Sequence, residues 1–332
     1  MRSSCSLRAL ALLALLGFVG CKPAPEASVE PQPEAGPNER AVDEFGPWIA
    51  PLERDHPLVG TAWSPSEARA ISRTELERRL AAARYVLLGE THDNPDHHRL
   101  QGVAIEAVAG AAAERRPAVA FEMLDPAKQA AIDAFAGEVD DFAEVVAWAD
   151  SGWPAWSIYR PVFAATLAAD LPIYAAELPR DETRRFMAEG LAIFDPDLVA
   201  RFGLAQPLAP ELQSAWLDEM FASHCDMVPR EHLGGMVEIQ RLRDARMADA
   251  MQRGAAAQGQ AILVAGGGHV RDVGVPRLLR ALEPDAAIVS VGFVAAQAGQ
   301  LDPREYGDEF DVLVFTPDVE REDPCASFSP RQ

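Results

Sequence analysis

The chain has 332 residues, of which 48% are hydrophobic and 24% are charged. This balance is ordinary for a globular protein with a full core, and it excludes disorder for most of the chain. The formal net charge is −21, so a nucleic acid would meet a repulsive field rather than a basic stripe.

The first twenty residues have the features of a secretory signal peptide. Arg2 and Arg8 precede or flank a short apolar run, which is shorter than the roughly 20 residues of a bilayer-spanning helix. The run ends in Phe-Val-Gly-Cys21, which resembles the lipobox of bacterial lipoproteins, although Phe18 stands where that pattern usually has leucine. We expect a signal peptide over residues 1–20 and a lipid anchor on Cys21. The alternative is an ordinary signal peptide that is cut elsewhere.

Three further segments follow the signal peptide. Residues 21–51 are rich in Pro, Glu and Ala and predict a flexible tether, because this composition cannot bury enough surface to offset its ordering entropy. A single domain is expected over 52–318, followed by a loose tail over 319–332. Cys225 and Cys325 could pair in an oxidising compartment, but the sequence does not show that they meet.

Within the predicted domain, apolar runs of strand length alternate with helical patterns. The runs are 85–88, 119–121, 173–176, 261–265, 287–293 and 312–315, and helices are expected over 101–115, 125–135, 159–169 and 275–282. Continuous apolar runs indicate strands that are buried on both faces, and helices in the connections favour parallel pairing. The predicted fold is therefore α/β, a largely parallel sheet with helices on both faces and a strand-free helical cap inserted over about 180–254.

Polar side chains follow four of the predicted strands at the points where the strands end. Glu90 and His92 follow the first strand, Glu122 the second, Glu177 the third and His269 the fourth. Ligands of open α/β sheets bind beyond the carboxyl ends of the strands, so we expect Glu90, His92, Glu122 and His269 to share one crevice. Glu and His suit a divalent metal, and His also serves as an acid or base. If only one such glutamate were present, a helix-capping or salt-bridge role would be favoured over ligand binding.

Other polar and aromatic clusters allow two interpretations each. His97 and His98 are adjacent at the start of a helix, so at most one is expected to face the crevice. The glycines at 266–268 could cradle a phosphate, but the sequence has neither a GxGxxG pattern nor a P-loop lysine, which favours a turn or a close backbone approach. Two clusters could either line a haem pocket or pack as ordinary core: Met220, His224, Cys225, Met227, His232 and Met236 in the cap, and Trp148, Trp153, Trp156 and Tyr159 before it.

Five motifs together resemble those of the ChaN-type haem-binding lipoproteins of the haem-binding uptake and Tiki superfamily. They are LLGETHDNPDHHRLQ from Leu87, FEM at 121–123, W-x-x-YRP at 156–161, QRLRDARMA at 240–248 and GGGHVRDVGVP at 266–276. The resemblance implies a lipoprotein that faces the periplasm, binds haem and takes part in iron uptake. In the characterised case, haem lies between two protomers and a tyrosine ligates the iron. The resemblance also implies kinship with Tiki-type metalloproteases and erythromycin esterases.

The resemblance extends to individual residues. By motif match, Glu90, His92, Glu122 and His269 occupy the positions of active-site Glu and His in those enzymes, as catalytic residues or metal ligands. No tyrosine aligns by motif with the haem ligand. The haem-binding candidates are His92, His98, Tyr159, His224 and His269.

Two functions follow from these expectations. The first is haem binding for iron acquisition, and the alternative is a Glu/His-dependent or metal-dependent hydrolase. Haem is the expected cofactor, with a divalent metal as the second candidate. The expected partners are haem or another small ligand, the membrane through the N-terminal lipid, a second copy of the chain, and an envelope transporter or receptor. Lys22 replaces the aspartate that retains enteric lipoproteins at the inner membrane, which favours the outer membrane.

Overall fold

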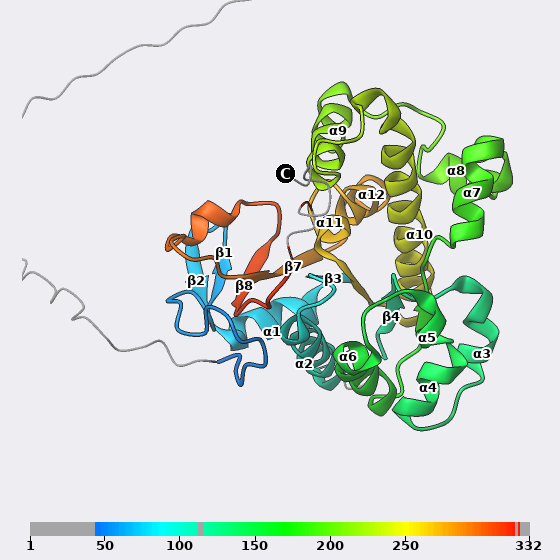
Figure 1. Ribbon diagram of the computed structural model, residues 1–332. Coiled ribbons are helices and arrows are strands. Elements are labelled where there is room, and N and C mark those ends of the chain that lie inside the picture. Colours follow the sequence, from blue (N-terminus) through cyan, green and yellow to red (C-terminus); the bar gives the residue numbers. More distant parts are fainter. Residues whose placement is uncertain (1–43, 112–115, 323–324, 326–332) are drawn as a thin grey trace, which may run out of the picture. The chain divides into compact units, whose positions relative to one another are not determined.

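The computed structural model describes residues 44–111, 116–322 and 325. The predicted signal peptide, Cys21 and most of the predicted tether lie outside these residues. Figure 1 shows a central sheet with helices packed around it. Within the described ranges, no helix combines the length and the apolar character that crossing a bilayer requires.

One sheet of eight strands organises the described chain, in the order β2-β1-β8-β7-β3-β6-β4-β5. Neighbours from β8 to β5 pair in parallel, whereas β1 pairs antiparallel with both β8 and β2. The strands are β1 (Ala62–Ser64), β2 (Arg69–Ile71), β3 (Tyr85–Glu90), β4 (Ala118–Phe121), β5 (Ile173–Ala175), β6 (Ala261–Gly266), β7 (Ile288–Ala295) and β8 (Val312–Thr316). The six predicted strands are confirmed.

Helices cover both faces of this sheet, as the sequence predicts. Before the cap they are α1 (Arg73–Ala82), α2 (Pro95–Ala111), η1 (Pro126–Lys128), α3 (Gln129–Asp133), α4 (Val139–Val145), α5 (Trp148–Ser151) and α6 (Trp156–Ala168). After it come α11 (Gly267–Val270), α12 (Val275–Leu282) and η4 (Pro303–Tyr306). Alternate residues of β3 point to opposite faces: Val86 and Leu88 pack with α1, α2 and α6, and Tyr85 and Leu87 pack with α10 and α12.

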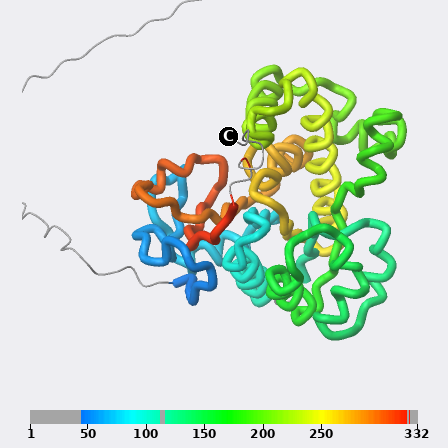
Figure 2. The backbone as a smooth tube through the Cα atoms, viewed as in Figure 1, coloured from blue at the N-terminus to red at the C-terminus, as the bar shows by residue number. Residues whose placement is uncertain are grey.

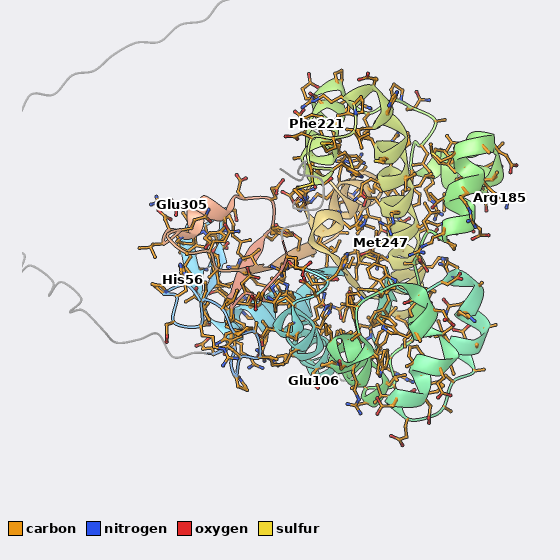
Figure 3. The ribbon with its side chains drawn as sticks, in the orientation of Figure 1. His56, Glu106, Arg185, Phe221, Met247 and Glu305 are labelled. Atoms are coloured by element: carbon orange, nitrogen blue, oxygen red, sulfur yellow. A yellow bond between two sulfur atoms is a disulfide. The ribbon has the colours of Figure 1, made fainter. Side chains whose placement is uncertain are left out.

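The predicted cap is present as a helical insertion between β5 and β6. Its elements are α7 (Arg180–Glu189), η2 (Gly190–Ile193), α8 (Pro196–Arg201), α9 (Pro210–Ser223), η3 (Arg230–His232) and α10 (Gly234–Gln258). Figure 2 shows these helices as one group, coloured from green to yellow. The last of them, α10, is also part of the core, since Met247 on its inner side is fully buried (Figure 3).

The packed domain extends beyond both predicted boundaries. Phe45 and Ala50, assigned to the tether by composition, are buried, and Ala50 N–H donates to the carboxylate of Asp96 at 2.8 Å. At the other end Arg321, assigned to the loose tail, pairs with Asp93 at 2.7 Å. Composition misses these residues because their order comes from contacts with α2 and with the loop before it.

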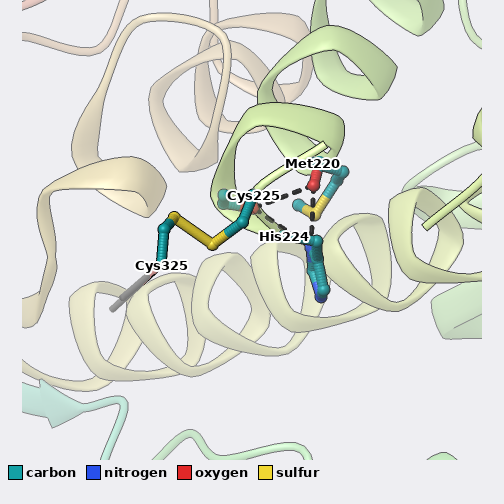
Figure 4. The surroundings of a disulfide bond; sticks show 5 residues. Met220, His224, Cys225 and Cys325 are labelled. Atoms are coloured by element: carbon teal, nitrogen blue, oxygen red, sulfur yellow. Dashed lines mark hydrogen bonds between the residues drawn. A yellow bond between two sulfur atoms is a disulfide. The ribbon is translucent and has the colours of Figure 1, made fainter. Parts of the chain in front are cut away.

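Cys225 and Cys325 form a disulfide, which the sequence left open. Figure 4 shows the bond beside the C-terminal end of α9, where His224 Nδ1 donates to the carbonyl oxygen of Met220 at 2.7 Å. The bond closes a loop of 100 residues and joins the cap to the C-terminal segment. Cys225, one of the cap residues considered above for a haem pocket, is therefore engaged in a covalent bond, and His224 and Met220 of the same cluster are hydrogen-bonded to each other.

Candidate functional site

The carboxyl ends of three neighbouring strands meet at the candidate site. Glu90 at the end of β3 lies opposite Gly266 at the end of β6, and the N–H of Glu122, just after β4, donates to Val264 of β6 at 3.1 Å. Parallel pairing in this register delivers the polar residues after each strand to one edge of the sheet. The structure therefore brings together the four residues predicted to share a crevice.

Glu90 and His92 form the first imidazole–carboxylate pair of the site. His92 Nδ1 lies 2.6 Å from Glu90 Oε1, and the Tyr159 hydroxyl lies 3.4 Å from both atoms. The ring of His92 also makes an edge contact with Trp153, at 4.9 Å between ring centroids. Burial acts to lower the pKa of His92, but the hydrogen bond and negative charge of Glu90 outweigh it, so this pKa is raised above its usual value.

Glu122, His269 and Asp244 form the second group. His269 Nδ1 lies 2.6 Å from Asp244 Oδ1, and His269 Nε2 lies 3.4 Å from Glu122 Oε1. The second oxygen of Glu122 accepts a hydrogen bond from the backbone N–H of Gly266 at 2.8 Å. All three side chains are buried. The imidazole of His269 is thus held between two carboxylates, with both of its nitrogens engaged.

In this second group, Glu122 and His269 each stabilise the charged form of the other. Burial opposes ionisation of Glu122, but the charge and hydrogen bond of His269 lower its pKa to about 2. Burial likewise disfavours the imidazolium of His269, but Glu122 and Asp244 together raise its pKa to about 9. Burial raises the pKa of Asp244, against the opposing effect of His269. Removing one partner would leave the others charged in a place that water does not reach.

Gly266 lies between the two groups. A Cβ atom at this position would come within 2.8 Å of His92 Cε1 and within 3.6 Å of Glu122 Oε2. Its backbone φ of −58° is open to any residue, so the glycine is required here by the close approach of the His92 ring. A Cβ at Gly267 or Gly268 would meet nothing closer than 3.6 Å. The close approach predicted for the glycine run thus applies to its first member.

A cleft of about 390 Å³ opens beside His92. Its walls include apolar side chains from the loop after α5, from the segment after β5 and from α10, together with two arginines: Trp153, Leu178, Ile239, Arg180 and Arg243. Glu177 lies on the same cleft, where burial raises the pKa of its carboxyl to about 7, with Asp125 acting in the same direction. The cleft thus combines an imidazole, an indole and opposite charges.

The predicted haem-binding residues differ in their access to this cleft. His92 lines it, with 44% of its side chain exposed. His98 and Tyr159 are buried; His98 bonds through its two nitrogens to the His92 carbonyl and to Gln101. His269 is enclosed as described above, and His224 ends α9 near the disulfide. Their haem-binding roles stay predictions, but in this arrangement His92 is the one of the five candidates that lines the cleft.

A divalent metal finds no support in this arrangement. In the described parts of the chain, no group of three His, Cys, Asp or Glu side chains is placed to hold a metal ion. Glu90 instead pairs with His92, and Glu122 pairs with His269. The four predicted ligands thus lie near one another in two pairs, and Oε2 of Glu90 is buried without a hydrogen-bond partner.

Three residues of the site were not predicted as site residues, although Arg243 and Asp244 lie within the QRLRDARMA motif. Asp244 orients His269, and Arg180 and Arg243 line the cleft. The sequence does hold a signal for Asp244, because this carboxylate lies among the apolar residues of a predicted helix. Such a residue is expected to be buried, and a buried charge needs a partner. Arg180 carries no comparable signal, since its position on the cleft depends on how the cap folds back.

Stability should depend on pH through His269. The pKa of His269 is raised in the folded state. Its contribution to the free energy of unfolding is therefore complete below the unfolded pKa of 6.5 and is lost as the pH rises through about 9. The shift corresponds to roughly 3 kcal/mol. Denaturant unfolding at pH 6.5 and above pH 9 measures the loss. His269→Gln should show a much smaller difference between the two conditions; an unchanged difference would assign it to other groups.

Comparison with known proteins identifies the family. The family described as "Haem-binding uptake, Tiki superfamily, ChaN" matches residues 76–279, so the chain belongs to this family, as its motifs predicted. The comparison with curated proteins yields no match. Among solved structures, the chain is similar to ChaN of Campylobacter jejuni, described by its cofacial haem binding. The identity is 24%, the match covers 76% of this chain and 95% of that chain, and the TM-score is 0.59.

More distant likenesses are found to two further solved structures. One is the type III effector HopBA1, with 14% identity, coverage of 77% of this chain and 94% of that chain, and a TM-score of 0.43. The other is the erythromycin esterase EreC, with 13% identity, coverage of 81% and 86%, and a TM-score of 0.38.

Proposed function

We propose that this protein binds haem in the cleft beside His92, where Nε2 of His92 would hold the iron. The observation that carries the proposal is the geometry of this one imidazole. Glu90 holds Nδ1 at 2.6 Å, whereas Nε2 makes no hydrogen bond to any described residue and the ring lines the cleft. A carboxylate behind a ligating histidine fixes the ring orientation and raises its basicity.

The cleft has the chemistry that a haem group requires. Its volume of about 390 Å³ lies within the usual range of ligand pockets, so it would cover part of a porphyrin. Trp153 offers a flat face, and Leu178 and Ile239 offer apolar contacts. Bound haem supplies an iron with an open coordination position. Because the pKa of His92 is raised, its Nε2 would have to release a proton to solvent water before it could hold the iron, while Glu90 would keep the hydrogen bond from Nδ1.

A haem titration of the purified protein tests the proposal. We expect a Soret band that saturates at a fixed stoichiometry, with a spectrum typical of histidine-ligated iron. The absence of any spectral change with excess haem would refute haem binding. Metal analysis of the same preparation separates iron from other metals.

The proposal includes a cell-envelope setting. A lipid on Cys21 would anchor the domain to the membrane, facing the periplasm and most consistently at the outer membrane. There the domain would hold haem for iron acquisition, with a second copy of the chain or an envelope transporter or receptor as its protein partner. Support comes from the sequence of residues 1–22 and from family membership. Radiolabelled lipid incorporation that is lost in Cys21→Ala tests the anchor.

Gly266→Ala should weaken haem binding by about tenfold. The new Cβ would come within 2.8 Å of His92 Cε1, so the ring must move away from its position against Gly266. Such overpacking costs roughly 1–3 kcal/mol. Haem affinity measured by titration gives the size of the effect. Gly268→Ala is the matched control, since its nearest neighbour would lie at 3.9 Å; equal losses in both variants would contradict this reading of Gly266.

A hydrolase is the second candidate, and one observation favours it. Asp244 fixes the orientation of His269 at 2.6 Å, and Glu122 lies beside the other nitrogen. Such arrangements allow histidine to act as a general base or acid. In this role Glu122 would exchange a proton with His269, while Glu90 and His92 would act on the opposite side of Gly266. Ester hydrolysis that is lost in His269→Ala while haem binding persists would favour this candidate.

A further inference from the structure

Two arginines of the cleft lack close partners. The side chain of Arg180 makes no hydrogen bond and no ion pair within 4.0 Å of any described residue. Arg243 has its nearest carboxylate oxygen, of Glu122, at 3.9 Å, which is too far for a hydrogen bond. Their neighbours behave differently, since Arg241 and Arg246, also on α10, make close ion pairs with Glu238 and Glu182. Arg180 is exposed and Arg243 is half-buried, so both guanidinium groups are accessible to a ligand that enters the cleft.

Helix stability does not explain Arg180. It is the first residue of α7, where the helix dipole disfavours a positive charge. Its guanidinium lies against Gly152, where a Cβ would come within 2.7 Å of one of its nitrogens. Gly152 thus leaves room for this side chain beside Trp153, on the wall of the cleft.

The charges around the two arginines are not balanced locally. Glu177 is the acid that shares the cleft with them. Burial and Asp125 raise the pKa of its carboxyl to about 7, outweighing Arg243 and Arg180, which act to lower it, and this disfavours its charged form. Glu122 is already committed to His269 and to the N–H of Gly266. An anionic group entering the cleft would therefore meet two guanidinium groups able to donate charge-assisted hydrogen bonds, which are among the stronger ones in proteins.

We propose that Arg180 and Arg243 bind the carboxylates of a porphyrin whose ring lies against Trp153, so that the cleft selects a tetrapyrrole diacid over its ester. This inference rests on the proposed function and adds that the protein recognises the two carboxylates of the ligand. The arginines lie on different elements, α7 and α10, and both line the cleft, so each would meet one of the two carboxylates. The apolar residues Leu178 and Ile239, which line the same cleft, would contact the body of the ring.

Metal-free protoporphyrin IX and its dimethyl ester test the inference, because neither contains iron for His92 to ligate. We expect the protein to bind the diacid about tenfold more tightly than the ester, as measured by porphyrin fluorescence. Arg180→Gln and Arg243→Gln should each remove most of this preference and leave ester binding unchanged. Arg184→Gln, on the same helix and exposed, is the matched control and should keep the preference.

Two results would overturn the inference while leaving the proposed function standing. One is equal affinity of the unmodified protein for diacid and ester. The other is an equal loss of both in the arginine variants, which would indicate a change in packing. A protein that binds neither porphyrin nor haem refutes the proposed function, and the inference falls with it. In Arg180→Gln and Arg243→Gln, haem should still give the spectrum of the unmodified protein at saturation.

Discussion

His92→Ala is expected to weaken haem binding by about 100-fold and to abolish the absorption spectrum of histidine-ligated iron. Changes in the groups that merely orient a metal ligand already cost about 10–100-fold in affinity, so loss of the ligand itself should be at least as severe. Titration with haem gives the affinity, and the spectrum at saturation reports the ligand. Adding free imidazole to His92→Ala should restore much of the spectrum, because imidazole can occupy the space left by the side chain.

His224→Ala serves as the matched control for this prediction. His224 is also a candidate ligand from the sequence, but it ends α9 beside the disulfide, and Met220 accepts the hydrogen bond from its Nδ1 (Figure 4). We expect haem affinity and spectrum to stay unchanged in this variant. A normal spectrum in His92→Ala, or loss of the spectrum in His224→Ala, would show that the iron is held elsewhere.

The variant Glu90→Gln distinguishes the role of His92 from the effect of the negative charge on Glu90. The amide can still accept a hydrogen bond from His92 Nδ1, but it lacks the charge that raises the basicity of the imidazole. Haem affinity should therefore fall by about tenfold while histidine ligation is retained. This result differs from the loss expected for His92→Ala.

The parallel part of the fold could be predicted because its signals are local. Each strand from β3 to β8 is an apolar run, and the residues after β3, β4 and β6 are polar. Once these strands are parallel neighbours, their ends meet by geometry alone. β1 and β2 could not be predicted in this way, since each has three residues and β2 is largely exposed. β1 joins the sheet by pairing with β8, a long-range contact, and β2 joins it by pairing with β1.

The choice among the histidines could not be made from the sequence. His92 and His98 belong to the same loop and helix start, and both are reasonable ligands by residue type. The structure separates them because Gln101 and the His92 carbonyl occupy the nitrogens of His98, whereas the His92 ring lines the cleft and its Nε2 makes no hydrogen bond to a described residue. Such differences depend on side-chain partners rather than on spacing. The same holds for Arg180 and Arg243, which reach the cleft from two cap helices.

Asp244→Ala is expected to destabilise the fold by roughly 3–5 kcal/mol. Asp244 is fully buried on α10 and lies 2.6 Å from His269 Nδ1, so its removal leaves a buried imidazole N–H without its carboxylate partner. Alanine has a higher helix propensity than aspartate, which would act in the opposite direction. The loss, measured by denaturant unfolding at pH 6.5, would therefore come from the broken pair.

Two variants identify the source of this loss. Asp249→Ala, on the same helix, removes a carboxylate that pairs with Arg201 and Arg253 near the surface, and it should cost no more than about 1 kcal/mol. Asp244→Asn keeps a hydrogen-bond acceptor but removes the charge, so it should be milder than Asp244→Ala and should lower the pKa of His269 from about 9. Histidine NMR titration measures that change. An unchanged pKa of His269 in Asp244→Asn would show that Asp244 does not stabilise the protonated imidazole. The stability lost in Asp244→Ala would then have to come from packing rather than from the ion pair.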